Sequence, residues 1–128
     1  MTIDPTELPE VLALTPAVFG DARGTFSETF NAKTFNDAIG YHVTVVQDNH
    51  SISAPWVLRG LHYQIKQPQG KLVLVIKGAI LDVAVDIRRS SPRFGQWIAR
   101  RLDAENRTQI WVPEGFAHGF VAFENGAE

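Results

Sequence analysis

Short apolar runs, rich in β-branched and aromatic residues, recur along this chain between glycine, proline and asparagine breaks, and none is longer than a strand. Only residues 32–39 carry a helical pattern. Turn signals such as those at 90–92 and 113–115 separate the runs. The pattern predicts an all-β domain with one short helix and with strands at 43–49, 56–64, 71–77, 79–87, 97–102, 109–112 and 116–123.

Length and composition exclude several classes of protein. The chain has 128 residues, and we expect residues 1–128 to form a single domain. A formal net charge of −2 offers no basic surface for nucleic acid, and the apolar runs are too short to span a membrane. Cysteine is absent, which excludes disulfides and thiol catalysis. The first ten residues do not resemble a signal peptide, so a cytoplasmic location is expected.

Two histidine-containing segments are spaced like the metal-binding segments of cupins. The usual cupin pattern has H-x-H, then an acidic ligand seven residues before a glycine, then P-x-G-x-x-H. Here His62 and His118 remain, whereas Gln64 replaces the second histidine and Lys71 replaces the acid. An ammonium group has no lone pair, and two separated histidines are a poor ligand set for a divalent metal. The resemblance therefore predicts a cupin-type β-barrel, or jelly roll, without a metal.

The remaining polar residues suit proton removal next to a carbonyl group. His62 would be the base, and the fixed charge of Lys71 would hold the resulting oxyanion. A histidine between apolar strand neighbours is also common as a hydrogen-bonded core residue, and both interpretations stay open. Arg59 would face away from His62 and Gln64 unless the backbone kinks at Gly60. Several cations buried together favour a negatively charged ligand.

Residues 71–87 are expected to fold on themselves at a tight turn formed by Lys77 and Gly78. In that register Lys71 shares a face with Asp82 and lies diagonal to it. The two would form either a structural ion pair or a functional pair, and Asp82 would support Lys71 in both cases.

Other polar residues are weaker candidates for binding groups. The triplet at 47–49 closes an apolar strand and offers amide donors and acceptors, although strand termination would use the same residues. Residues 23–28 alternate in a way that equally fits an exposed edge strand. His118 lies between glycines in an apolar run and is expected to face the barrel interior as a substrate contact or hydrogen-bond partner.

Together these segments resemble the dTDP-4-dehydrorhamnose 3,5-epimerase family. The likeness runs through 18–24, 46–51, 58–64, 69–73, 82–88 and 111–120, nearly the whole sequence. It implies a cofactor-free isomerase of dTDP-L-rhamnose biosynthesis. Such an enzyme inverts C3 and C5 of a dTDP-4-keto-6-deoxyhexose through enolate intermediates.

The resemblance also implies a role for each candidate residue. His62 would accept the proton, and Lys71 would stabilise the enolate oxygen. The implied substrate contacts are Arg59 and His118 at the nucleotide or sugar, Gln47, Asp48 and Asn49 along the diphosphate and sugar, and Arg23 and Glu28 at the thymidine. In the family the N-terminal strands exchange between subunits, so residues 1–30 are expected to reach a partner in a homodimer.

The sequence departs from the family at its end. Family members continue into a segment with a tyrosine proton donor and an aspartate that orients the catalytic histidine, and neither falls within these residues. The only tyrosines are Tyr41 and Tyr63, and Tyr63 belongs to the histidine motif. We therefore expect this chain at best to bind dTDP-sugars, and to epimerise them slowly or not at all unless residues outside the chain complete the site. An apolar strand directly before the end also predicts an unpaired barrel edge, which another chain or a longer parent would close.

Two alternatives stay open from the sequence. One is an enzyme that epimerises a single carbon of a dTDP-sugar. The other is a catalytically impaired nucleotide-sugar-binding cupin that keeps Arg59, Lys71 and the triplet at 47–49. A 3,4-ketoisomerase fits the segments at 59–64 and 113–120 less well.

Overall fold

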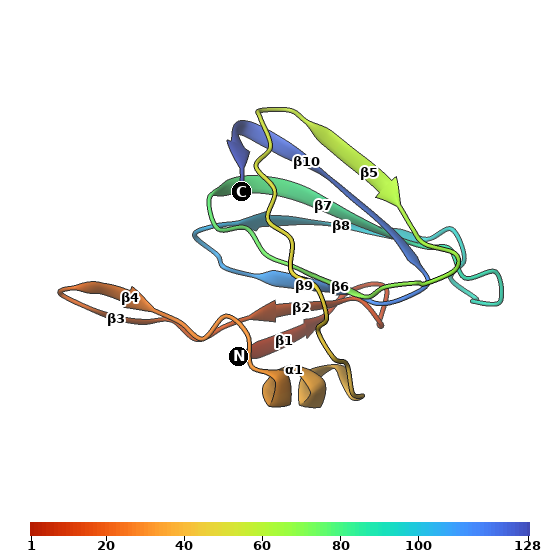
Figure 1. The fold of residues 1–128 in the computed structure, drawn as a ribbon, viewed down its shortest axis with the longest axis horizontal. Helices are drawn as coiled ribbons and strands as arrows, with labels where there is room; N and C mark the ends of the chain where they lie inside the picture. Colours follow the sequence, from red (N-terminus) through yellow and green to blue (C-terminus); the bar gives the residue numbers. More distant parts are fainter.

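Ten strands and one helix follow one another in the computed structural model, which describes all residues 1–128 (Figure 1). The helix is α1 (Ala32–Ile39). The strands are β1 (Thr2–Pro5), β2 (Leu12–Thr15), β3 (Phe19–Asp21), β4 (Gly24–Phe26), β5 (Leu58–His62), β6 (Lys71–Val73), β7 (Gly78–Asp86), β8 (Trp97–Asp103), β9 (Gln109–Val112) and β10 (Phe116–Ala127). No helix has the length and apolar character needed to cross a membrane.

Two antiparallel sheets form the body of the molecule, in the orders β1-β2-β9-β6 and β5-β10-β7-β8. Strands β3 and β4 pair only with each other, in a hairpin that projects from one end (Figure 1). The main core lies between the sheets, because its cluster of 12 buried residues draws on both. Ile110 and Val112 come from one sheet, and Ile80, Ala84 and Ile98 come from the other. An all-β sandwich of this kind confirms the expected fold class.

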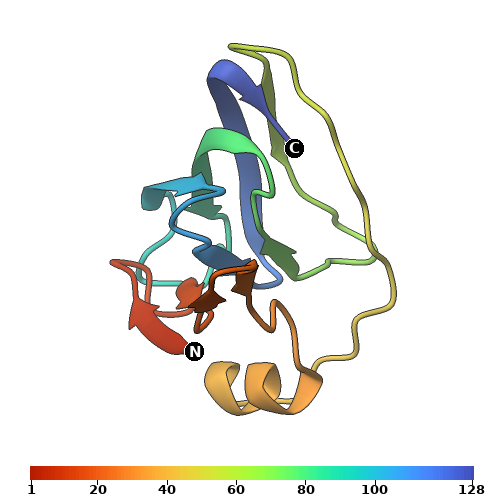
Figure 2. The same cartoon turned by 90° about the vertical axis from the view of Figure 1, so that its left-hand side faces the viewer.

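Helix α1 covers the outer face of the β1-β2-β9-β6 sheet. Asn31 caps it by accepting a hydrogen bond from the backbone N–H of Thr34 at 3.1 Å, and Gly40 ends it with a φ of +82°. The buried ring of Phe35 meets Trp111 of β9 edge to face, with 5.1 Å between ring centroids. Figure 2 shows α1 at the side of the body occupied by β1 and β2. The helix predicted at 32–39 is confirmed.

The strands predicted from 56–64 and from 79 onward are confirmed with altered ends. Strand β5 is shorter than expected, and β10 continues to Ala127. The prediction for 43–49 is wrong, because those residues lie outside every strand. A strand needs a neighbour for its backbone hydrogen bonds, and none lies beside this segment within the chain. Val46 is 86% exposed there.

The hairpin predicted for 71–87 is also wrong. Strand β6 pairs with β9, and Lys71 lies opposite Val112, whereas β7 belongs to the other sheet. The chain therefore crosses from one sheet to the other between Val73 and Gly78. The alternation itself is confirmed, since Val75, Ile80 and Ala84 all enter the core between the sheets.

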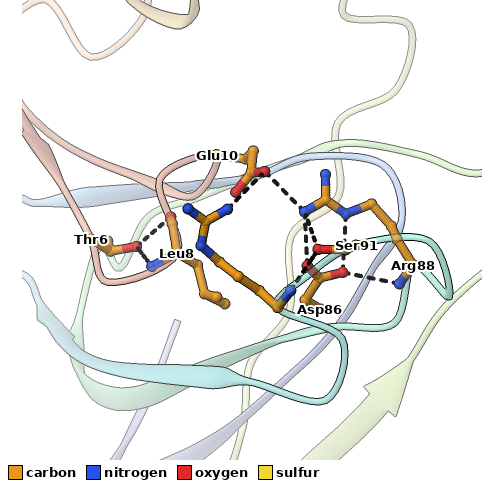
Figure 3. A network of polar contacts seen from close by, with 7 residues as sticks. Thr6, Leu8, Glu10, Asp86, Arg88 and Ser91 are labelled. Atoms are coloured by element: carbon orange, nitrogen blue, oxygen red, sulfur yellow. Dashed lines mark hydrogen bonds and ion pairs between the residues drawn. The ribbon is translucent and has the colours of Figure 1, made fainter.

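An arginine-centred network ties the N-terminal segment to the end of β7 (Figure 3). Arg88 donates to both carboxylate oxygens of Asp86, at 3.0 and 2.8 Å, and to Glu10 at 3.0 Å. Ser91 donates to Asp86 at 2.6 Å, and the Arg88 guanidinium lies 4.8 Å from the centroid of the Phe116 ring. The hydrogen bonds from Arg88 lower the pKa of the fully buried Asp86 from 3.8 to about 2.

We expect Asp86→Asn to destabilise the protein by about 2 kcal/mol at neutral pH, the free energy that corresponds to the pKa shift. Because the folded-state pKa is depressed, this stabilisation is present above the unfolded value near 3.8 and is lost as the pH falls toward about 2. Urea unfolding of both proteins between pH 7 and pH 2 measures it. Asp37→Asn, which breaks the exposed Lys33–Asp37 pair, is the control and should cost a few tenths of a kcal/mol. A constant difference across that pH range would contradict the assignment.

Candidate active site

The inner face of the β5-β10-β7-β8 sheet carries two histidines side by side. His62 of β5 and His118 of β10 are directly opposite each other in the antiparallel ladder. Residues opposite each other in such a ladder project from the same face. His118 is buried, as the sequence predicted for a residue that faces the interior, whereas His62 is exposed. That exposure excludes the interpretation of His62 as a hydrogen-bonded core residue.

A β-bulge at Gly60 brings Arg59 to the same face. The register passes from His118 opposite His62 to Phe120 opposite Arg59, so β5 has one more residue than β10 across this interval. Because residues 118 and 120 share a face, Arg59 and His62 share it too. Gly60 has a φ of +119°, and a Cβ there would lie 2.6 Å from the Cα of Gly119. The backbone therefore kinks at Gly60, which is the condition under which the sequence allowed Arg59 to share a face with His62.

His118 forms a buried pair with Asp82 of β7. Their Nε2 and Oδ2 atoms lie 2.7 Å apart, and Asp82 is fully buried. Burial raises the pKa of the Asp82 carboxyl, and the hydrogen bond and charge of His118 partly oppose that rise. An ionised Asp82 holds the proton of His118 on Nε2 and leaves Nδ1 as the free ring nitrogen.

The pairing of Asp82 with Lys71 that the sequence predicted is wrong. Asp82 bonds His118, and its second oxygen, Oδ1, is buried without any hydrogen-bond partner. The physical reason is topological, because Lys71 and Asp82 belong to opposite sheets rather than to one hairpin.

Lys71 instead projects from the facing sheet toward the same interior. It lies opposite Val112, a core residue, and two residues from Val73, which packs against the core. Its side chain is half-buried. The interior thus receives Arg59, His62 and His118 from one sheet and a cation from the other. The two carboxylates that β7 places on this face, Asp82 and Asp86, are already paired with His118 and Arg88, so an anionic ligand is favoured.

Arg59 is oriented by residues that the sequence analysis did not identify. Its Nε donates to the Oγ of buried Ser53 at 3.1 Å, and its Nη2 reaches the carbonyl of Ile52 at 3.5 Å. Ser53 is itself fixed by backbone hydrogen bonds in both directions with Ala127, at 2.9 and 3.0 Å. Nothing in the sequence pattern marks Ser53, because its partners are 6 and 74 residues away.

The remaining predicted site residues lie apart from the histidines. Gln47 donates to Asn49 at 3.0 Å within the exposed segment that contains Asp48, and no hydrogen bond joins this triplet to His62 or His118. Arg23 lies at the tip of the β3–β4 hairpin and bonds Asp21, with the shortest distance 2.6 Å.

The other residue predicted to hold the thymidine, Glu28, accepts a hydrogen bond from Asn31 at 3.3 Å. Arg107, another residue that sequence reasoning missed, fixes the base of the hairpin by donating to Thr25 at 2.8 Å and to Ser27 at 3.3 Å.

The hairpin also bears a hollow of its own. A cavity of about 420 Å³ lies against it, bordered by Phe19, Asp21, Arg23, Thr25 and Phe26. Phe19 and Phe26 are directly opposite each other in the ladder and are 64% and 71% exposed. A pair of exposed aromatic rings beside an arginine offers a surface on which a flat ring can stack.

Comparison with known proteins gives one consistent family. The family model described as dTDP-4-dehydrorhamnose 3,5-epimerase matches residues 5–128. Two relatives with that description come from Pseudomonas aeruginosa, 58% identical over 121 residues, and from Escherichia coli K12, 51% identical over 129 residues. These matches cover 94% and 100% of this chain, but 67% and 70% of the relatives.

Solved structures agree with this result. The dTDP-6-deoxy-D-glucose-3,5-epimerase RmlC from Legionella pneumophila, in complex with dTDP-4-keto-L-rhamnose, superposes with a TM-score of 0.96 at 49% identity. That match covers 98% of this chain and 67% of the Legionella chain. ChmJ, a 3'-monoepimerase from Streptomyces bikiniensis in complex with dTDP-quinovose, superposes with a TM-score of 0.88 at 33% identity. That match covers 96% of this chain and 63% of the ChmJ chain.

We expect Gly60→Ala to lower the free energy of unfolding by about 3 kcal/mol, because it places a Cβ against the backbone of β10 at a positive φ. Gly95→Ala is the matched control, since Gly95 has a φ of +81° but open space around an added Cβ. That control should cost only about 1 kcal/mol. Chemical denaturation measures both, and equal losses would show that steric contact with Gly119 is unimportant.

Proposed function

The chain belongs to the dTDP-4-dehydrorhamnose 3,5-epimerase family, a family of isomerases, and on that premise we propose that it inverts C3 and C5 of a dTDP-4-keto-6-deoxyhexose. One observation carries the proposal for this chain. The bulge at Gly60 aligns Arg59 with His62 on the face that also bears His118. A base and an anion-binding cation on one interior face are what proton abstraction from a nucleotide sugar requires.

The proposed chemistry begins with His62 as the proton acceptor. His62 removes the proton from the carbon beside the 4-keto group. The electron pair of the broken C–H bond forms a carbon–carbon double bond, and the carbonyl π electrons move to oxygen. Lys71 stabilises that enolate oxygen by its charge, and its lack of an ion-pair partner in the protein leaves the charge available. Return of a proton to the opposite face inverts the carbon, and the same steps at the other carbon complete the reaction.

Neither tyrosine of the chain suits the return of that proton. The hydroxyl of Tyr41 accepts a hydrogen bond from Trp111 at 3.2 Å, on the outer side of the sheet that α1 covers. Tyr63 directly follows His62, and successive residues of an extended chain point to opposite faces. We therefore expect proton removal to outpace net epimerisation in this chain.

The other candidate residues are proposed to bind the substrate. Arg59, oriented by Ser53, would pair with the diphosphate, since a guanidinium binds phosphate oxygens well. His118, with its proton held by Asp82, would contact the sugar or nucleotide. The exposed triplet Gln47, Asp48 and Asn49 would line the path of the diphosphate and sugar.

A homodimer is proposed in which the β3–β4 hairpin reaches the partner's site. The hairpin projects from the side of the body opposite the arrowhead end of β5, the strand that ends at His62 (Figure 1). Its exposed Phe19 and Phe26 would be costly to leave in water and would serve as a platform for the thymine ring. Arg23 and Glu28 would then act in the partner's site. The proposed location is cytoplasmic.

Deuterium incorporation into dTDP-4-keto-6-deoxyglucose tests the proposed reaction. The chain is expected to exchange C3 and C5 protons in deuterated water, and His62→Ala should slow exchange about 1,000-fold, as expected for loss of a general base. His42→Ala is the matched control, because His42 is exposed and its ring hydrogen-bonds only to Asn36 and Thr44. Mass spectrometry and proton NMR measure the exchange at each carbon.

The same measurement separates the alternatives. Exchange at C3 alone would favour a single-carbon epimerase, a candidate supported by the likeness to the 3'-monoepimerase ChmJ. Tight dTDP binding with no exchange at either carbon would leave a nucleotide-sugar-binding cupin. Exchange unaffected by His62→Ala would contradict the assignment of the base.

Mixing two inactive variants tests the exchanged hairpin. We expect His62→Ala and Arg23→Ala to lose activity alone and to regain part of it when refolded together. In a mixed dimer one site then contains His62 of one chain and Arg23 of the other, both intact, whereas the second site carries both substitutions. No recovery in the mixed dimers would mean that each hairpin serves its own chain.

A further inference from the structure

The base of the β3–β4 hairpin is held by the loop between β8 and β9. Arg107 of that loop donates to the hydroxyl of Thr25 at 2.8 Å and to the hydroxyl of Ser27 at 3.3 Å. No other hydrogen bond joins residues 19–27 to the rest of the chain, since β3 and β4 pair only with each other. The hydrogen bonds that orient the hairpin thus come from one side chain.

The next two residues hold the chain where it enters and leaves the hairpin. The hydroxyls of Thr108 and Thr15 lie 2.9 Å apart. The Nε2 of Gln109, a residue that is only 2% exposed, donates to the carbonyl of Thr29 at 2.6 Å. Residues 107–109 therefore fix the segment before the hairpin, the hairpin itself and the segment after it.

Packing does not replace these hydrogen bonds. A cavity of about 230 Å³ is bordered by Ser27 and Thr29 on one side and by residues 74–76 on the other. Arg107 and Gln109 border the same cavity. Protein interiors are normally close-packed, so a gap of this size means that apolar contacts hold the base of the hairpin weakly. Its direction is set by the polar contacts instead.

The loop is built to keep Arg107 in place. Arg107 has a φ of +53°, a left-handed conformation that is uncommon for a residue other than glycine. Its backbone N–H donates to the carbonyl of Asp103 at 3.1 Å, and Oδ1 of Asp103 accepts from the backbone N–H groups of Glu105 and Asn106 at 3.1 and 2.7 Å. Oδ1 of Asn106 accepts from the backbone N–H of Thr108 at 3.0 Å. A strained backbone enforced by its surroundings often marks a functional position.

We propose that Arg107 is a positioning residue that presents the aromatic face of the hairpin, Phe19 and Phe26, to the nucleotide. The proposal rests on the function proposed above, in which these rings stack on thymine. Successive residues of a strand point to opposite faces, so Arg107 holds the hairpin by Thr25 while Phe26 projects from the other face. Phe19 lies directly opposite Phe26 and shares that face. A hairpin held in advance loses less conformational freedom when the nucleotide binds.

Titration calorimetry with dTDP, on the full chain and its variants, tests the proposal. Arg107→Gly removes both hydrogen bonds to the hairpin and also relieves the left-handed backbone, so stability to urea should change little. The dissociation constant for dTDP should rise about 10-fold, as expected if the hairpin is correctly oriented about one-tenth of the time. Arg107→Lys keeps a cation that can reach one hydroxyl and should recover part of the affinity. Arg89→Ala removes an exposed arginine and is the control, with wild-type binding expected.

Two further measurements separate positioning from a general structural role. For deuterium incorporation into the keto-sugar, Arg107→Gly should raise KM about 10-fold and leave the rate at saturation within about twofold of wild type. Backbone amide exchange without ligand should become faster in residues 19–26 and stay unchanged in β7 and β10. A fall in the saturated rate with KM unchanged, or unaltered exchange in the hairpin, would overturn the proposal.

Phe26→Ala distinguishes failure of this proposal from failure of the thymidine site. If Phe26→Ala weakens dTDP binding and Arg107→Gly does not, the hairpin binds the nucleotide but Arg107 does not position it. If neither weakens binding, the hairpin is not the thymidine site, and both proposals are overturned. If only Arg107→Gly weakens binding, Arg107 acts by a route other than the aromatic face. The epimerase chemistry is judged separately by the effect of His62→Ala on deuterium exchange.

Discussion

The approach of β5 to β10 at Gly60 and Gly119 determines which side chains enter the barrel. A Cβ on Gly60 would lie 2.6 Å from the Cα of Gly119, and a Cβ on Gly119 would lie 2.6 Å from the carbonyl oxygen of Arg59. The two strands can approach this closely only because both positions are glycine, and the close approach accommodates the extra residue of the bulge. Without the bulge, Arg59 and His62 would project from opposite faces, and the base would be separated from the proposed phosphate ligand.

The electrostatics of the interior follow from which charges are already paired. Asp82 is committed to His118 at 2.7 Å, and its burial raises the pKa of its carboxyl. Lys71 and Arg59 have no carboxylate partner, because Asp82 and Asp86 on that face are paired with His118 and Arg88. An interior face with unpaired cations favours an anion, which fits the diphosphate and the enolate of the proposed reaction. In the proposed reaction Lys71, which stands where the cupin pattern has an acid, stabilises negative charge.

Segments outside the two sheets are held to them by specific side-chain contacts. Helix α1 covers the outside of one sheet through Phe35 and Trp111, and the network of Asp86, Arg88 and Glu10 holds the N-terminal segment to the other sheet. The β3–β4 hairpin has no such support from the sheets, because its strands pair only with each other.

Local pattern was sufficient for part of this description. Alternating apolar residues predicted the all-β class, the helix at 32–39 and the inward orientation of His118, because periodicity and turn residues act over a few positions. The spaced motifs around His62 and His118 were sufficient to indicate the family. The pairing of strands was not predictable in this way: whether β6 lies beside β7 or β9 depends on contacts between distant segments. The pairing of β6 with β9 puts Lys71 and Asp82 in opposite sheets, and Asp82 bonds His118 instead. The pairing of Ser53 with Ala127 likewise joins segments that are distant in the sequence. The sequence by itself determined which residues can do chemistry, and tertiary structure decided which of them meet, because strand register is set by the packing of the whole barrel.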